Sequence, residues 1–351
     1  MLVENVLIVD PVDGEYVGTV EFEDVILEIR KSDKSSFEHI LMPAFVDPHI
    51  HGIKGIDTMT ASQENFERFK EYEALEGVWY FQPTTVTCPL DELRKIKIPS
   101  ELKLHIEGPF IAPKRKGAHN ESYIQSPPRD VRELEQYLSL SSIGMITVAP
   151  EYDSFLDFAK SCELNNIRIS VGHTDATFAQ AKKAFENGFR RITHFPNALS
   201  PLHHRELGVT GAGLLLDFTL EIIADGIHCA PEFVNFVYKV KGAEKIILVT
   251  DSISATGLED GNYMLGDLHV KVENGIAKLS DGTLAGSTLR FSQAVKNFAK
   301  FTRCSLKELA MVSSYNACKD LNLNGGRIKE GYPAKLVLLD DGLNIKKVWN
   351  F

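Results

Sequence analysis

Residues 167–195 read IRISVGHTDATFAQAKKAFENGFRRITHF, and this stretch decides the fold that we expect. It begins with a short β-branched run (167–172) and ends with another (190–195). Between them, apolar residues recur every three or four positions (175–188), which is typical of a helix with one buried face. Compact runs that are apolar on both faces are typical of strands buried in a parallel sheet. The stretch therefore predicts a strand–helix–strand unit.

The same unit recurs along most of the chain. Eight runs of the strand type occur, at 41–47, 78–87, 102–108, 144–150, 167–172, 190–195, 220–226 and 244–251. Segments with helical spacing lie at 62–77, 126–141, 153–166, 175–188, 230–244, 287–301 and 305–321. Eight strands with intervening helices over about 260 residues match the size of a TIM-like (β/α)8 barrel. An open, doubly wound sheet is the alternative, but it gives no reason for functional residues at the end of nearly every strand.

The two ends of the chain differ from this pattern. Residues 1–40 and 330–351 indicate short strands and turns rather than strand–helix units. We expect both ends to pair in one small β-sandwich domain, beside a barrel that spans residues 41–329. A further hairpin is predicted at 265–282, with its turn at Asn274-Gly275.

The composition excludes several classes of protein. Hydrophobic residues make up 44% and charged residues 25% of the 351 residues, which argues against long disorder. Acidic residues outnumber basic ones 48 to 38, so we expect no binding to nucleic acid or to a membrane surface. The first 29 residues contain no Lys or Arg, unlike a secretory signal. Five scattered cysteines without a CxxC pair predict a reduced, cytoplasmic protein.

His49 and His51 stand two positions apart where the first run ends. Side chains at this spacing point to the same face of a strand. Two neutral imidazoles placed in this way can bind one ion of Zn or Fe. Two ordinary histidines at the end of a strand are the alternative reading.

Ligand-type residues also stand at the ends of other runs. The carboxyl ends of barrel strands form one ring around the active site. We therefore predict a divalent metal site made of His49, His51, Glu107, His173, His194 and Asp251. A carboxylate beside a metal can take a proton from the bound water and return it to a leaving group. Asp251 is the candidate for this catalytic role, and a helix N-cap is its alternative role.

Seven segments occur in a characteristic order: MPAFVDPHIHG (42–52), HIEGPFIAPKRKGAHN (105–120), VGHTDAT (171–177), THFPNALSPLHHRE (193–206), DGIHC (225–229), VTDSISATG (249–257) and LAGST (284–288). Together they resemble the amidohydrolase superfamily and, within it, the family of N-acetylglucosamine-6-phosphate deacetylases. The tail at 326–340 resembles the closing β segment of the superfamily. The resemblance implies metal-dependent hydrolysis of the acetamide of N-acetylglucosamine 6-phosphate to glucosamine 6-phosphate and acetate.

The resemblance also implies roles for individual residues. Glu107, His173 and His194 would hold the metal ion of the family, and Asp251 would be the catalytic acid/base. Substrate contacts are implied for Ala118, His119, Asn197, Ala198, Arg205, Asp225, His228, Leu284, Ala285 and Gly286.

Three of these substrate contacts have a stated role. His119 would help to polarise the acetyl carbonyl, and Arg205 would bind the phosphate. His228 would bind substrate in its own subunit or in the neighbouring subunit of a homodimer.

Local charge agrees with an anionic substrate. Basic residues gather at 114–116 and 203–205, and the arginine fork binds phosphate well, although solvated loops are the alternative. Many superfamily members bridge two metals with a carboxylated lysine on the fourth strand. The fourth run here ends at 148–151 without a lysine, so Glu107 would replace that bridge. The sequence is compatible with one bound ion or with two. The alternative functions are another amidohydrolase activity or a catalytically silent scaffold.

Overall fold

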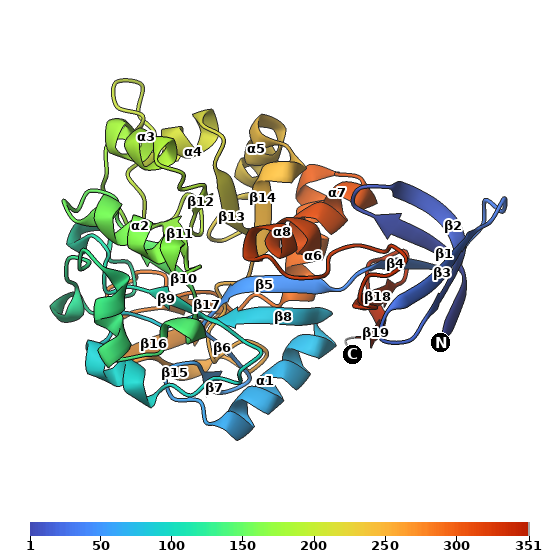
Figure 1. Cartoon of the computed structure of the whole chain (residues 1–351), viewed down its shortest axis with the longest axis horizontal. Helices are drawn as coiled ribbons and strands as arrows, with labels where there is room; N and C mark the ends of the chain where they lie inside the picture. Colours follow the sequence, from blue (N-terminus) through green and yellow to red (C-terminus); the bar gives the residue numbers. More distant parts are fainter. Residues whose placement is uncertain (350–351) are drawn as a thin grey trace.

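A curled parallel sheet forms the centre of the computed structural model, which describes residues 1–349 (Figure 1). Six of its strands pair in the order β14-β13-β12-β11-β10-β9, and β5 pairs with β8. Their bounds are β5 (Phe45–Ile50), β8 (Val78–Pro83), β9 (Leu104–Glu107), β10 (Ile143–Val148), β11 (Arg168–Val171), β12 (Arg191–Ile192), β13 (Thr219–Ile223) and β14 (Ile246–Val249). The architecture is TIM-barrel-like, as the eight strand-type runs predict.

Hydrogen bonds join the two parts of this sheet. The main-chain N–H of Thr85, just after β8, donates to the carbonyl of His105 in β9 at 3.0 Å. The N–H of Asp251, just after β14, donates to the carbonyl of His49 in β5 at 2.9 Å. The segment after β14 is therefore bonded to β5, and the sheet closes on itself. The chain segments that follow the strands lie around one common axis.

The first predicted run, 41–47, is divided between two sheets. Its first half belongs to β4 (His39–Pro43), which pairs with strands from the chain ends, while β5 begins at Phe45. The N–H of Ala44 donates to Lys335 beside β4, whereas that of Phe45 donates to Gly77 beside the barrel. The two N–H groups on successive residues point to different sheets, which the apolar pattern alone does not reveal.

Helices occupy most of the segments in which they are expected. They are α1 (Gln63–Leu75), α2 (Phe155–Leu164), α3 (Phe178–Glu186), α4 (Gly208–Leu215), α5 (Pro231–Lys241), α6 (Phe291–Thr302), α7 (Leu306–Ala310) and α8 (Asn316–Leu321), with a π-helical turn, η7 (Met311–Tyr315), between the last two. Short 3₁₀ turns are η1 (Leu90–Lys95), η2 (Pro113–Arg115), η3 (Glu121–Tyr123), η4 (Val131–Gln136), η5 (Leu140–Ser142) and η6 (Ala243–Lys245).

One expected helix is absent, and one helix of the structure was not expected. The helix expected at 126–141 is wrong, because only η4 and η5 form there. Prolines at 127 and 128 and an Asp130 side chain that accepts from the N–H of Arg132 favour tight turns at this point. Helix α4 was not predicted, because its first six residues are all buried and it therefore lacks a polar face.

Strands from both chain ends form one six-stranded sheet at the other side of the molecule (Figure 1). Its order is β19-β18-β4-β1-β2-β3, with β1 (Leu2–Asp10), β2 (Gly14–Phe22), β3 (Ile26–Lys31), β18 (Leu336–Leu339) and β19 (Ile345–Trp349). The rings of Phe22 and Trp349 meet edge to face at 5.4 Å, although their strands are four places apart in the sheet. The sheet therefore curls around its own core, and β4 crosses the predicted boundary between residues 40 and 41.

A small antiparallel sheet follows β14. It contains β15 (Gly261–Leu265), β16 (Leu268–Glu273) and β17 (Ile276–Lys278), and a two-stranded ribbon of β6 (Gly52–Ile53) and β7 (Ile56–Asp57) lies after β5. Asn274 and Gly275 have φ values of 52° and 71°, the left-handed values of a tight hairpin turn, so the predicted turn is confirmed. Among residues 1–349, no helix combines the length and the apolar character that crossing a membrane requires.

Candidate metal centre

His49 in β5 and His51, directly after β5, face a pair of carboxylates inside the barrel. Nε2 of His49 lies 3.5 Å from Oε2 of Glu107 and 3.4 Å from Oδ1 of Asp251. Nε2 of His51 lies 3.3 Å and 3.0 Å from the same two oxygens. All four side chains are buried, and they form a group whose ligand atoms could surround one ion.

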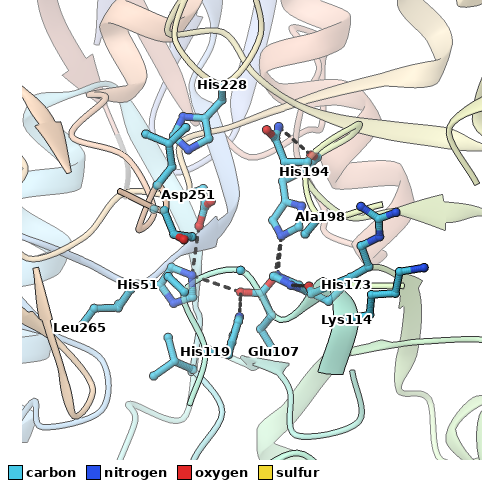
Figure 2. Close-up of a pocket in the computed structure, with 18 residues that line it drawn as sticks. His51, Glu107, Lys114, His119, His173, His194, Ala198, His228, Asp251 and Leu265 are labelled. Atoms are coloured by element: carbon cyan, nitrogen blue, oxygen red, sulfur yellow. Dashed lines mark hydrogen bonds and ion pairs between the residues drawn. The ribbon is translucent and has the colours of Figure 1, made fainter. Parts of the chain in front are cut away.

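A second group shares Glu107. Nε2 of His194 lies 3.0 Å from Oε1 of Glu107, and Nε2 of His173 lies 3.4 Å from the same oxygen. The two Nε2 atoms are 2.9 Å apart. Oε2 of Glu107 faces His49 and His51, so this carboxylate stands between the two groups. Figure 2 shows Glu107 between His51 and His173. The geometry thus gives Glu107 the bridging position that the lysine-free fourth run suggests.

Outer contacts hold the imidazoles in place. Nδ1 of His49 lies 3.0 Å from Oε2 of Glu221, Nδ1 of His51 lies 3.2 Å from the carbonyl of Thr84, and Nδ1 of His173 lies 2.8 Å from the carbonyl of Arg115. Each contact orients its ring and turns Nε2 towards the carboxylates, and Nε2 is the atom through which a neutral imidazole would bind a metal.

The backbone adds to this positioning. His173, His194 and Asp251 have φ values of 45°, 27° and 50°, a conformation that is strained for residues with a side chain. All three stand directly after or close to the end of a barrel strand. Strain of this kind persists only where the surrounding structure imposes it, and here it brings three ligand-type side chains together.

The donor set suits a cation. Within residues 1–349, Nε2 of His49 and Oε1 of Glu107 are buried without a hydrogen-bond partner. A buried polar atom without a partner is costly unless something compensates it, and a metal ion would do so for both atoms. Imidazole nitrogen together with carboxylate oxygen is a donor set that zinc and iron accept.

Asp251 is an ionised carboxylate at the edge of the cluster. Burial raises its pKa, but His49, His51 and His194 together hold the pKa of this carboxyl well below its ordinary value. A carboxylate in this form can accept a proton from a group beside the cluster.

The side chain of His119 directs an N–H donor towards Glu107. Its Nδ1 accepts a hydrogen bond from the N–H of Thr87 at 3.0 Å, so its proton is on Nε2, which lies 3.5 Å from Oε2 of Glu107. Burial and the nearby His173 lower the pKa of His119 to about 4, which keeps the ring neutral. Gly108 permits this arrangement, because a Cβ at that position would lie 2.0 Å from Oγ1 of Thr87.

A cavity of about 340 Å³ opens above these side chains. Seven of the ten expected substrate residues line it: Ala118, His119, Asn197, Ala198, His228, Leu284 and Gly286. Lys114 and Arg115 also form part of its wall, and both pair with Asp175. Figure 2 shows Lys114 beside His173. The cavity therefore has the ligand cluster at its floor and basic side chains at its rim.

Three expected substrate residues stand elsewhere. Asp225 lies behind the wall, 2.7 Å from Nδ1 of His228, and Ala285 is fully buried in a small apolar cluster with residues of β15–β17. Arg205 is exposed in the 203–206 turn, with Nη1 2.9 Å from Nε2 of His204. Arg205 therefore does not line the cavity of its own chain.

Comparison with known proteins shows the family of the chain. The profile of the Amidohydrolase family matches residues 40–351. The chain belongs to the amidohydrolase family. It is 40% identical to an N-acetylglucosamine-6-phosphate deacetylase of Lysinibacillus sphaericus, over 86% of this chain and 82% of the relative. A Bacillus subtilis (strain 168) enzyme of the same name is 36% identical, over 95% of this chain and 88% of the relative.

Solved structures agree with this assignment to the amidohydrolases. The N-acetylglucosamine-6-phosphate deacetylase of Thermotoga maritima is 49% identical, covers 99% of this chain and 98% of its own, and superposes with a TM-score of 0.91. The enzyme of Mycobacterium smegmatis, solved in complex with N-acetyl-D-glucosamine-6-phosphate, is 26% identical with a TM-score of 0.91, over 99% of this chain and 97% of its own. The resemblance read from the sequence motifs is therefore confirmed.

Three residues that support this amidohydrolase site were not predicted. Glu221 contacts His49 and the N–H of His194, Thr87 orients His119, and Arg191 donates from Nε to Oε1 of Glu221 at 2.7 Å. Glu221 is a lone carboxylate within an apolar strand, a signal that marks it as paired or functional. Thr87 carries no comparable signal in the sequence.

Proposed function

We propose that the chain hydrolyses the acetamide of N-acetylglucosamine 6-phosphate to glucosamine 6-phosphate and acetate, as a step in the breakdown of amino sugars. The observation that carries this proposal is that the ligand cluster, the ionised Asp251 and the neutral His119 meet at one cavity. The names of the relatives at 40% and 36% identity support the choice of substrate.

A divalent ion, Zn or Fe, is part of this proposal. Glu107, His173 and His194 would hold one ion, and His49, His51, Glu107 and Asp251 offer a place for a second. When bound, the metal lowers the pKa of a water molecule and polarises the acetyl carbonyl.

The side chains then carry the protons. Asp251 takes a proton as the water attacks the acetyl carbon, and it later gives this proton to the departing amine nitrogen as the C–N bond breaks. Nε2 of His119 donates a hydrogen bond to the carbonyl oxygen, which becomes negatively charged during the attack. The hydrogen bond from Thr87 to Nδ1 supports this role, because it places the proton of the neutral ring on Nε2.

The remaining groups hold the sugar and its phosphate. We propose contacts from the cavity residues Ala118, Asn197, Ala198, His228, Leu284 and Gly286, with Ala285 and Asp225 supporting them from behind. Arg205 is proposed to bind the phosphate. A homodimer is also proposed. Because His228 lines the cavity of its own chain, the exposed Arg205 is the residue proposed to reach the neighbouring subunit's site.

An acetate-release assay tests the function. The protein is stripped with a chelator, supplied again with Zn²⁺ or Fe²⁺, and given N-acetylglucosamine 6-phosphate, with unphosphorylated N-acetylglucosamine as the control. We expect metal-dependent release from the phosphorylated sugar. No release with either metal would overturn the proposal.

A second substrate has its own support. A relative from Escherichia coli O157:H7 that is 33% identical is named N-acetylgalactosamine-6-phosphate deacetylase. The same assay with N-acetylgalactosamine 6-phosphate compares the two sugars, and a higher kcat/KM for the galactose epimer would favour this second candidate.

The division of the chain is proposed as a β-sandwich domain (1–40 and 330–351) beside a catalytic barrel (41–329). The contact between Phe22 and Trp349 supports a common core for the two ends. A cytoplasmic location is proposed as well, supported by the five free cysteines.

A further inference from the structure

Three arginines gather at the end of the barrel opposite the catalytic cavity. A second cavity, of about 110 Å³, is lined by Arg168, Arg190 and Arg191 together with residues of α2 and α8. Arg168 and Arg191 are the first residues of β11 and β12, whereas the ligand-type histidines follow the last residues of these strands. The two cavities share no lining residue. A space of this size holds several water molecules or one small polyatomic ion.

Arg191 is buried, and one of its donors has no acceptor. Only 2% of the residue is exposed. Its Nε donates to Glu221 at 2.7 Å and its Nη1 donates to Asp320 at 2.6 Å, but Nη2 has no hydrogen-bond partner among the described residues. A buried donor without an acceptor costs about 1–3 kcal/mol. Arg191 therefore adds positive charge to the wall of the cavity, but its Nη2 is enclosed by protein atoms.

The other two arginines carry charge that no carboxylate balances. Arg190 donates to the carbonyl of Phe185 and lies 3.9 Å from the centre of that ring. Neither Arg168 nor Arg190 forms an ion pair with any carboxylate of residues 1–349, although acidic residues are in excess in this chain. Glu163 and Asp320 also line the cavity, and Asp320 is already paired with Arg191. Among the lining residues, three guanidinium groups stand against the carboxylates of Glu163 and Asp320, which is an excess of one positive charge.

We propose that this cavity binds a small inorganic oxyanion of the phosphate or sulfate type. The planar guanidinium fork offers paired N–H donors that match such an ion. The ion would accept from the guanidinium groups of Arg168 and Arg190 and would neutralise their charges. This site is separate from the proposed catalytic cavity and does not depend on the reaction proposed there.

Calorimetric titration of the whole protein with sodium phosphate, at constant ionic strength, tests this site. Arg191 is unsuitable for substitution because it also holds Glu221, so the test variant is Arg168→Gln/Arg190→Gln. The matched control is Arg94→Gln/Arg129→Gln, which changes the net charge equally at two exposed arginines that pair with Asp91 and Asp157. Circular dichroism and Tm verify that both variants are folded.

Phosphate binding to the test variant is expected to weaken by about tenfold or more, the effect of losing a charged hydrogen bond, while the control stays close to the unmodified protein. Sulfate should compete with phosphate, and chloride should not. Equal phosphate affinity in the test and control variants, or chloride binding as tight as phosphate binding, would overturn the proposal. Acetate release from N-acetylglucosamine 6-phosphate should be retained in the test variant, so a failure of the catalytic proposal would be visible separately.

Discussion

Oε2 of Glu221 lies 3.0 Å from Nδ1 of His49, although the two residues are 172 positions apart in the sequence. The same oxygen accepts the main-chain N–H of His194 at 3.1 Å, and Oε1 accepts from Arg191. One buried carboxylate thus connects both groups of ligand-type side chains with a buried arginine. Residues in this position orient metal ligands and tune their basicity.

Replacing Glu221 by Gln should therefore weaken metal binding. The variant keeps the size of the side chain but loses the charge that faces His49 and Arg191. We expect metal affinity to fall about 10–100-fold, the usual effect of losing such a partner. Titration against a competing chelator measures this, with Glu232→Gln on the exposed face of α5 as control. Unchanged affinity in the Glu221 variant would contradict the role.

Asp251→Asn should separate catalysis from metal binding. The amide keeps an oxygen near His51 but cannot take the proton from the attacking water. Turnover of N-acetylglucosamine 6-phosphate is expected to fall at least about 10²–10⁴-fold, while the metal content stays near that of the unmodified protein. Elemental analysis and single-turnover acetate release measure the two effects. A kcat close to the original would refute the catalytic role of Asp251.

His119→Ala should remove the donor to the acetyl oxygen. We expect kcat to fall about 10²–10³-fold, the effect of losing one donor to a developing oxyanion. Binding of metal should change little, because the Nε2 proton of His119 makes it a donor rather than a ligand. The comparison of kcat with metal content decides the point: loss of metal in parallel with activity would show that His119 acts as a ligand instead.

Arg205→Ala should affect the phosphorylated substrate selectively. Loss of a charged hydrogen bond to phosphate should lower kcat/KM for N-acetylglucosamine 6-phosphate about tenfold or more. The rate with N-acetylglucosamine should stay nearly the same. The control is Arg94→Ala, which also removes one positive charge from an exposed arginine. Equal losses on both sugars would exclude a phosphate contact by Arg205.

Glu73 should make the fold less stable as the pH rises. It is buried in α1, and its Oε2 has no hydrogen-bond partner in the described part of the chain. Burial, and then the nearby carboxylates of Asp47 and Glu76, raise its pKa well above the ordinary value. The folded state therefore holds this proton more tightly than the unfolded state does, so the free energy of unfolding falls as the pH rises above the unfolded pKa of about 4.3.

Glu73→Gln removes this penalty. We expect the variant to be more stable than the unmodified protein at pH 8 and to gain less at pH 5. Urea unfolding at both pH values measures the difference, and Glu71→Gln on the exposed face of the same helix is the control. An equal gain at both pH values would show that charge on Glu73 is not the cause.

The TIM-barrel-like fold followed from local patterns. Short runs that are apolar on both faces, such as 244–251, can be buried only as strands covered on both sides. His49, Glu107 and His173 were recognisable as candidates because each ends or follows such a run. The division between β4 and β5 was not recognisable from the sequence. The chain passes from one sheet to the other at Ala44 because the N–H groups of Ala44 and Phe45 donate to different sheets, and the apolar pattern does not report this direction.

Sequence alone therefore determined the strand-type runs of the barrel, the ligand-type residues at their ends and the family to which the chain belongs. Only the tertiary structure decided which nitrogen of His119 carries the proton, which carboxylate supports His49, and that Arg205 stands outside the cavity wall of one subunit. The physical reason is distance along the chain. Periodicity reports which face a side chain takes on its own strand or helix, but hydrogen bonds between residues 32 or 172 positions apart depend on how those elements pack.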